Sequence, residues 1–287
     1  MSNPRADYTA IHNRKSLKLP NGARLALWVV VNVEEWDIND RMARQVLPTP
    51  QGAMVVPDVP NYSWHEYGMR VGFWRVKAVL DKLRIPVTVS LNGSVIDTYP
   101  EVFQSMVDAK WEMMGHGFVQ KAMPLVDDEE AVIRKTVDAI KNATGVAPRG
   151  WMGPGLAETW DTPDLLAAAG IEYICDWVMD DLPVPMKVKT GRMVSIPYTI
   201  ETSDITMYVV QNHRSPEIFD RGKDQFDRLY SEGAEEARIM CIALHPYVIG
   251  VPHRIGYLEK LLEYITSHDD VALMTGGEIL DWYDSQS

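Results

Sequence analysis

The feature that most constrains this chain is the repeated alternation of a short apolar, β-rich run with an amphipathic helical run. Segment 24–33 (RLALWVVVNV) is typical of a strand buried on both faces, 70–83 has apolar residues at helical spacing, and 85–92 is a second buried strand. Further strands are expected within 111–117, 171–177, 238–246 and 271–275, and further helices over 99–110, 127–145, 162–170, 215–233, 254–268 and 276–283. Strands that are apolar along their whole length and alternate with helices predict a parallel sheet covered by helices.

Helix boundaries are marked by capping residues. In 162–170 we expect Thr162 at the N-cap, Pro at the first helical position and Gly170 just past the end. The helix in 215–233 repeats this pattern with Ser215 and Pro216.

The number of repeats favours a distorted (β/α) barrel of about seven strands over a doubly wound sheet. The chain has no GxGxxG or Walker loop and no long linker between the repeats. We therefore predict one α/β domain over residues 1–287, with residues 1–20 as an N-terminal arm. In such barrels catalytic groups gather where strands end and loops begin.

Composition narrows the classes of partner. The chain has 28 basic and 40 acidic residues, a formal net charge of −12, which disfavours binding to nucleic-acid phosphates. The longest unbroken apolar stretch, 25–31, is far shorter than the ~20 residues of a membrane helix. Residues 1–16 show no apolar core of a secretory signal. We expect a soluble, cytoplasmic protein that binds neither nucleic acid nor membrane.

Polar residues follow nearly every predicted strand. They are Asn32, Glu34, Glu35, Asp37, Asn92, His116, Arg149, Trp151, Pro154, Asp176, Asp180, Asp181 and His245. Each alone is also explained as a helix cap, a turn residue or a solvated loop residue. A barrel, however, brings the ends of all its strands to one mouth.

These residue types point to hydrolysis. A carboxylate can take a proton from water, a histidine can protonate a leaving nitrogen, and a second histidine or backbone amides can hold an oxyanion. The sequence has no GxSxG elbow and no catalytic cysteine signature. Direct attack by water is therefore the preferred route.

Five segments, in order, resemble the motifs of the polysaccharide deacetylase (NodB-homology, carbohydrate esterase family 4) superfamily, from about residue 20 to the end of the chain. They are NVEEW (32–36), GHGFVQ (115–120), PRGWMGPG (148–155), CDWVMDDLP (175–183) and LHP (244–246). The resemblance implies the NodB-homology barrel and places a base in the first motif and an acid histidine in the last.

Two departures from the family motifs concern the residues that bind a divalent metal ion in other members. Members that use a divalent ion bind it through Asp and a His-x-x-x-His pair, whereas here Gln120 replaces the second histidine and Glu34 and Glu35 replace the aspartates. An amide is a poor zinc ligand compared with imidazole. We expect no cofactor; the alternative is a divalent metal such as zinc held by Glu35 and His116.

The same departures resemble a subgroup, the bacterial metal-independent allantoinases and related cyclic-imide or ureide hydrolases. The likeness extends to 62–76 (YSWHEYGMRVGFWRV) and 244–254 (LHPYVIGVPHR). It implies that water opens a ring in a small polar amide or ureide, and that the protein is a homo-oligomer. Two other hypotheses stay open: a metal-dependent deacetylase of N-acetylated sugars, and a binding protein that has lost its chemistry.

Candidate catalytic roles follow. Glu35 or Glu34 is the general base, and because strand side chains alternate, one should face the barrel mouth and the other its wall; we slightly prefer Glu35 for the mouth. His116 would hold the substrate carbonyl or the attacking water. His245 would protonate the departing nitrogen, and Asp176 would orient His245 or a substrate N–H.

Candidate substrate-binding residues are Arg70, Asn92, Trp151, Pro154, Asp180 and His253. Arg70 is equally well explained by a surface ion pair, Trp151 by the core, and His253 by a cap on the next helix. Segments 37–66 and 182–214 are assigned no elements, and the identity of the substrate depends on them.

Overall fold

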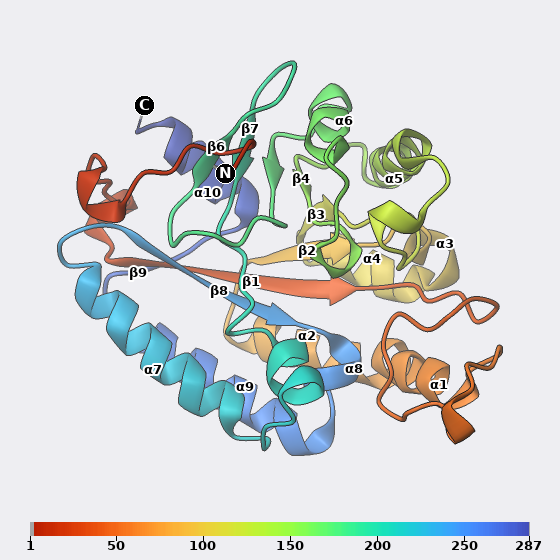
Figure 1. Cartoon of the computed structure of the whole chain (residues 1–287). Helices are drawn as coiled ribbons and strands as arrows, with labels where there is room; N and C mark the ends of the chain where they lie inside the picture. Colours follow the sequence, from red (N-terminus) through yellow and green to blue (C-terminus); the bar gives the residue numbers. More distant parts are fainter. Residues whose placement is uncertain (1–2, 287) are drawn as a thin grey trace.

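The predicted alternation forms one curved, parallel-dominated sheet with helices packed around it (Figure 1). The structure is a computed structural model that describes residues 3–286. Its strands are β1 (Leu25–Val33), β2 (Val87–Leu91), β3 (Glu112–Gly115), β4 (Gly150–Trp151), β5 (Tyr173–Ile174), β6 (Val184–Met186), β7 (Met193–Ser195), β8 (Arg238–Leu244) and β9 (Val271–Leu273).

The helices are α1 (Val59–Tyr67), α2 (Phe73–Lys82), α3 (Val95–Thr98), α4 (Pro100–Asp108), α5 (Glu129–Thr144), α6 (Thr162–Ala168), α7 (Glu217–Glu232), α8 (Pro246–Ile249), α9 (Pro252–Thr266) and α10 (Gly276–Asp284). The predicted helices are all present in the predicted order, and α1, α3 and α8 are present in addition. Single π-helical segments, η4 (Gly68–Gly72) and η7 (Ile205–Val210), precede α2 and follow β7. Within the described residues no helix is long and apolar enough to span a bilayer.

The sheet runs in the order β6-β7-β5-β4-β3-β2-β1-β8, and only β6 is antiparallel to its neighbour. The long strand β1 pairs with β8 along one edge and with β9 and then β2 along the other. One parallel bridge, Ser203 to Ala243, joins the segment after β7 to β8. The predicted α/β barrel-type fold is confirmed. Within residues 3–286 the sheet has nine strands rather than about seven, and its two end strands, β6 and β8, do not pair with each other.

Alternating residues of β1 face two different cores. Leu25, Leu27, Val29, Val31 and Val33 pack in the cluster that includes the apolar faces of α2, α7 and α9. Ala26, Trp28 and Val30 pack instead inside the curve of the sheet, with residues such as Cys241 and Ala243 of β8. The parity of a residue along β1 therefore decides whether its side chain faces the helices or the barrel interior.

Two helix starts differ from prediction by one residue. The N-cap of α6 is Asp161, with Thr162 already helical, and the N-cap of α7 is Pro216 rather than Ser215. Neither cap makes a side-chain hydrogen bond to the helix. The unassigned segments contain α1, β6 and β7.

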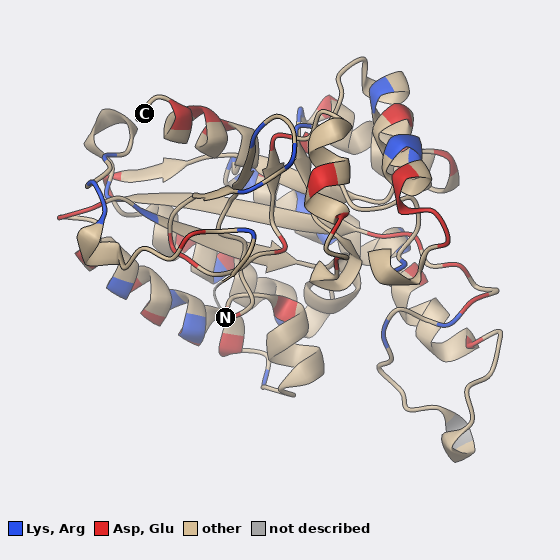
Figure 2. Cartoon of the chain, turned by 45° about the horizontal axis from the view of Figure 1, so that its top comes forward, with Lys and Arg blue, Asp and Glu red and all other residues tan. Residues whose placement is uncertain are grey.

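Charged residues on the helices are interleaved rather than segregated. On α7 basic and acidic residues are interspersed along the helix (Figure 2), with i,i+4 pairs such as Arg221–Glu217 and Lys223–Asp227. The N-terminal arm lies against the β6 end of the sheet, where Lys187 N donates to Arg5 O over 2.7 Å.

Candidate active site

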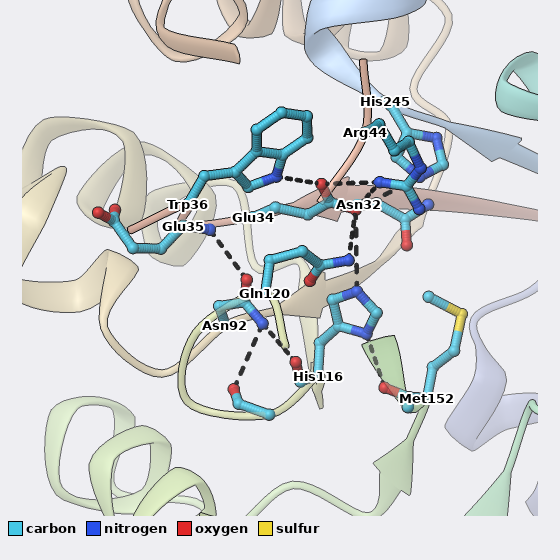
Figure 3. A network of polar contacts seen from close by, with 12 residues as sticks. Asn32, Glu34, Glu35, Trp36, Arg44, Asn92, His116, Gln120, Met152 and His245 are labelled. Carbon is cyan, nitrogen blue, oxygen red and sulfur yellow. Dashed lines mark hydrogen bonds and ion pairs between the residues drawn. The ribbon is translucent and has the colours of Figure 1, made fainter. Parts of the chain in front are cut away.

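Glu34 lies directly after β1 and is the centre of a buried polar network (Figure 3). Its Oε2 accepts hydrogen bonds from Trp36 Nε1 at 2.8 Å and Tyr247 Oη at 2.9 Å. Its Oε1 accepts from Gln120 Nε2 at 3.0 Å. The Arg44 guanidinium lies 3.1 Å from Oε1 and 3.2 Å from Oε2. Both carboxylate oxygens therefore already accept several hydrogen bonds, one set of them from a permanent cation.

This network keeps Glu34 ionised. Burial alone would raise the pKa of Glu34, but the charge of Arg44, together with contacts from His116 and His245, holds that pKa well below its usual range. Glu34 is thus a fixed negative charge at neutral pH, and its side chain is fully buried.

His245 lies directly after β8 and is held by a carboxylate that the sequence analysis did not identify. Its Nδ1 lies 2.7 Å from Asp204 Oδ1, and its backbone N–H donates to Asp204 Oδ2 at 2.7 Å. Because the carboxylate can only accept, Nδ1 carries the proton and Nε2 is the atom free to gain or lose one.

His116 follows β3 and is held in the same tautomer by a different acceptor. Its Nδ1 donates to the Met152 carbonyl oxygen at 2.6 Å. Its Nε2 is buried and has no hydrogen-bond partner among residues 3–286. A carbonyl oxygen cannot donate, so the proton again lies on Nδ1 and Nε2 is the available nitrogen.

The two available nitrogens converge on one oxygen. His245 Nε2 lies 3.6 Å and His116 Nε2 3.9 Å from the same atom, Glu34 Oε1. Two imidazole nitrogens that face one fixed negative charge form a centre in which protons can be passed to and from a bound reactant. Both side chains are nearly fully buried.

Glu35 points away from this centre, as Figure 3 shows. Burial, followed by repulsion from Glu66 and Asp37, raises the pKa of Glu35 to about 7. Its Oε2 is buried and has no hydrogen-bond partner within the described part of the chain.

The preference for Glu35 as the residue that faces the barrel mouth is therefore wrong in geometry. Glu34 has the parity of Trp28 and Val30, which face the barrel interior, whereas Glu35 has the parity of Val31 and Val33, which face the helices. The expectation that the two would face opposite ways is confirmed by these positions.

Asp176 does not orient His245, because that position is taken by Asp204. Instead, Asp176 accepts the Gly153 N–H through Oδ1 at 2.8 Å and Oδ2 at 3.0 Å. It lies beside a second buried carboxyl group, Glu158, and both pKa values are raised, chiefly by burial.

Two predicted substrate-binding residues have structural partners instead. Arg70 is exposed and forms an i,i+4 ion pair with Glu66 at 2.5 Å, which was the alternative explanation. Asn92 is buried; its Oδ1 accepts the Glu35 N–H at 2.9 Å and its Nδ2 donates to the His116 carbonyl. Asn92 thus fixes the backbone on which the site is built.

The remaining predicted binding residues lie in several places. Trp151 packs in the outer core with Ile133 and Leu166, because its parity on β4 turns it away from the barrel interior. Asp180 pairs with Arg14 of the N-terminal arm at 2.5 Å. His253 is an exposed residue in the first turn of α9.

Pro154 does lie against the histidine turn. A Cβ on Gly117 would meet Pro154 Cγ at 3.2 Å, so this proline packs on the Gly-His-Gly turn that carries His116.

Sequence reasoning missed Arg44 and Asp204, and gave no role to Trp36 or Tyr247. Arg44 and Asp204 come from the two segments that were assigned no elements. Trp36 and Tyr247 lie in the segments 32–36 and 244–254, which resemble the family, two residues after Glu34 and His245 respectively. This spacing was the sequence signal that could have indicated a role for them.

The residues around Glu34 do not fit a divalent metal ion of the kind that metal-dependent members of the family bind. No group of three or more His, Cys, Asp or Glu side chains among residues 3–286 is placed to hold one. A metal at Glu34 would have to displace Gln120 and compete with the Arg44 cation for the same oxygens. Glu35, which was predicted as the alternative metal ligand together with His116, points away from His116.

A comparison with protein families matches residues 63–174 to the polysaccharide deacetylase family. A Schizosaccharomyces pombe protein assigned to the polysaccharide deacetylases is 29% identical over 91% of this chain and 90% of its own length. A Helicobacter pylori peptidoglycan deacetylase is 28% identical over 74% of this chain and 83% of its own length.

Among solved structures, PuuE allantoinase superposes with a TM-score of 0.86 at 28% identity, over 99% of this chain and 98% of that one. These findings confirm the resemblance predicted from the five motifs: residues 63–174 match the polysaccharide deacetylase family, and the chain has the barrel fold seen in PuuE allantoinase.

Proposed function

We propose that this chain, with its polysaccharide deacetylase-type domain, hydrolyses a carbon–nitrogen bond in a small, polar cyclic amide or ureide, without a metal ion. One observation carries the proposal. Two histidines present their free Nε2 atoms to a fixed carboxylate whose oxygens already accept hydrogen bonds from an arginine, an amide, an indole and a phenol.

In this proposal the proton acceptor is an imidazole rather than a carboxylate, a change from the role expected of Glu34 or Glu35. A carboxylate with a lowered pKa is a weak base, and Glu34 is such a group. His116, with its Nδ1 donating to Met152 O, has a free Nε2 lone pair for the proton of an attacking water. Glu34 stabilises the imidazolium that results.

His245 keeps the role of acid. Its Nδ1–H is held by Asp204, and its Nε2 lies 3.6 Å from Glu34 Oε1. From Nε2 it gives its proton to the nitrogen that leaves the carbonyl carbon.

The proposed hydrolysis conserves atoms and protons. The water oxygen bonds to the carbonyl carbon while one water proton passes to His116 Nε2. The carbon–nitrogen bond then breaks, and the nitrogen takes the proton of His245 Nε2. In a cyclic substrate both new groups stay on one product, which is the ring-opened acid. Solvent restores the starting protonation of the two histidines.

A second candidate is a metal-dependent deacetylase of N-acetylated sugars. The specific observation in its favour is that the matching family and the curated relatives bear the name deacetylase. The arginine and amide donors on Glu34 weigh against it.

Hydrolysis of a small panel separates the two. The panel is allantoin, succinimide, dihydrouracil and an N-acetylglucosamine oligomer, each assayed with and without a chelator. We expect ring opening of one cyclic amide at a rate that the chelator does not change. Chelator-sensitive release of acetate from the oligomer would overturn the proposal and favour the deacetylase.

A further inference from the structure

One peptide group connects His116 to a buried acid pair that the proposed mechanism does not use. The Met152 carbonyl accepts from His116 Nδ1 at 2.6 Å. The N–H of the same peptide group, that of Gly153, donates to both oxygens of Asp176, at 2.8 and 3.0 Å. Asp176 therefore lies one peptide unit away from the imidazole (Figure 3 shows the His116–Met152 part).

A peptide group in this position transmits polarisation. A carboxylate that accepts an amide N–H strengthens the acceptor character of the carbonyl on the same peptide, because hydrogen bonds in a chain polarise one another, by about 10–30% per bond. A stronger acceptor on Nδ1–H makes Nε2 a better base. The arrangement is an indirect version of the direct contact between Asp204 and His245.

The backbone at Gly153 is closely fitted to this contact. A Cβ at Gly153 would lie 2.9 Å from the Ala157 carbonyl oxygen and 3.3 Å from Asp176 Oδ2. A side chain at this position would therefore push Asp176 or the backbone apart, and glycine permits the close approach.

The second acid, Glu158, is a buried neighbour of Asp176. Its Oε2 accepts from Trp177 Nε1 at 2.7 Å, and its buried Oε1 has no hydrogen-bond partner among residues 3–286. Burial raises both pKa values, and the negative charge of Glu158 raises that of Asp176 further. Glu129 and Arg5 act on Glu158 from farther away and with opposite signs.

We infer that Asp176 is a positioning residue for His116, acting through the Met152–Gly153 peptide, and that Glu158 sets how much negative charge Asp176 carries. The inference deepens the proposed function and rests on it for the role of His116 in turnover. The hydrogen-bonded path itself does not depend on the substrate.

Other charges also face His116 and stay the same in the test. Glu34 Oε1 lies 3.9 Å from its Nε2, and Arg44 and His245 surround that carboxylate. Their contribution is common to all variants, so a difference between variants reports on the acid pair.

The test compares Asp176→Asn and Glu158→Gln with the wild type, by nitrogen-15 NMR titration of the histidine rings. The His116 signals are assigned from the spectrum of His116→Gln. Glu158→Gln removes the neighbouring charge that disfavours ionisation of Asp176, so Asp176 should carry more negative charge and the His116 pKa should rise. Asp176→Asn removes the ionisable group that accepts the Gly153 N–H, so we expect the His116 pKa to fall. Asp180→Asn, in the same segment but paired with Arg14, is the matched control and should shift nothing.

Activity gives the second readout. In Asp176→Asn we expect kcat to fall by about 10-fold, as for other outer partners of a functional histidine. The acid limb of the pH–rate profile should move to lower pH in this variant and to higher pH in Glu158→Gln. A purely structural role would change kcat without moving the limbs in opposite directions.

Shifts of the His116 pKa in the same direction in both variants, or no shift in either, would overturn the inference. If Asp176→Asn does not fold, the upward shift expected in Glu158→Gln decides alone. Failure of the proposed function is separate: it would be seen as no turnover of any cyclic amide by a wild type whose His116 titration still responds to the acid pair.

Discussion

Glu34 and Glu35 are neighbours in the chain, yet they lie in opposite electrostatic environments. Glu34 faces the barrel interior, where Arg44 and three other side chains hydrogen-bond to it and its pKa is lowered. Glu35 faces the helices, where burial and the nearby charge of Glu66 raise its pKa to about 7. One step along the chain therefore decides between a fixed anion at the proposed reaction centre and a titratable group outside it.

The largest expected effect is the loss of turnover when His245, which faces Glu34, is replaced. His245→Ala should lower kcat by ~10²–10⁴, the usual contribution of a general acid or base. The measurement is steady-state turnover of the cyclic substrate. His253→Ala, exposed on α9, is the control and should keep wild-type turnover. Full activity in His245→Ala would remove His245 from the mechanism.

The buried Arg44–Glu34 ion pair should contribute more to the free energy of unfolding than the exposed Arg70–Glu66 pair. Arg44→Met leaves the buried Glu34 carboxylate without its cation, and breaking a buried pair in this way costs about 3–5 kcal/mol in the free energy of unfolding. Urea denaturation at pH 7 measures it. Arg70→Met, which breaks the exposed pair with Glu66, is the matched control and should leave the unfolding midpoint unchanged. Equal midpoints for the two variants would mean that the Arg44 pair is not structurally important.

The donor set around Glu34 predicts a change in metal binding. In Gln120→His an imidazole nitrogen replaces an amide that donates to Glu34 Oε1, so this variant should bind zinc more tightly than the wild type. Isothermal titration and metal analysis of the purified proteins check this. Gln104→His, on the exposed face of α4, serves as control. Stoichiometric zinc in the wild type would show that our reading of the donor set is wrong.

The smallest expected effect lies on the Glu35 side and depends on pH. Because the folded-state pKa of about 7 exceeds the ordinary 4.5, the folded protein holds this proton more tightly, and ionisation of Glu35 lowers stability as pH rises between these values. Glu35→Gln removes that loss. Its stability relative to wild type should therefore be more favourable at pH 8 than at pH 5, with Glu101→Gln on α4 as control. Parallel stability–pH curves for wild type and Glu35→Gln would contradict the raised pKa.

Much of the fold was predictable because its signals are local. Periodicity located β1, β2, β8 and most of the helices, and the parallel sheet followed from strands that are apolar on both faces. Because β1 is buried on both faces, its sequence pattern does not show which of its residues face the barrel interior. A strand with one polar face would have shown which of Glu34 and Glu35 points inward, whereas nine buried residues in succession do not.

The candidate site was predictable only in part. His116 and His245 lie at strand ends, where the barrel itself brings them together. Arg44 and Asp204 come from long segments without periodicity, and only the folded chain places them beside these histidines. Asp176 was expected near His245, but it contacts a backbone N–H next to the residue that holds His116.

The most direct test of the account is kcat/KM of Glu34→Gln beside Glu35→Gln, measured on the same cyclic amide at pH 7 with folding checked by circular dichroism. We predict a loss of at least about 100-fold in Glu34→Gln, the scale of removing one electrostatic contact at a reaction centre, and near wild-type activity in Glu35→Gln. The opposite pattern, with Glu35→Gln inactive and Glu34→Gln active, would contradict the assignment of Glu34 to the reaction centre.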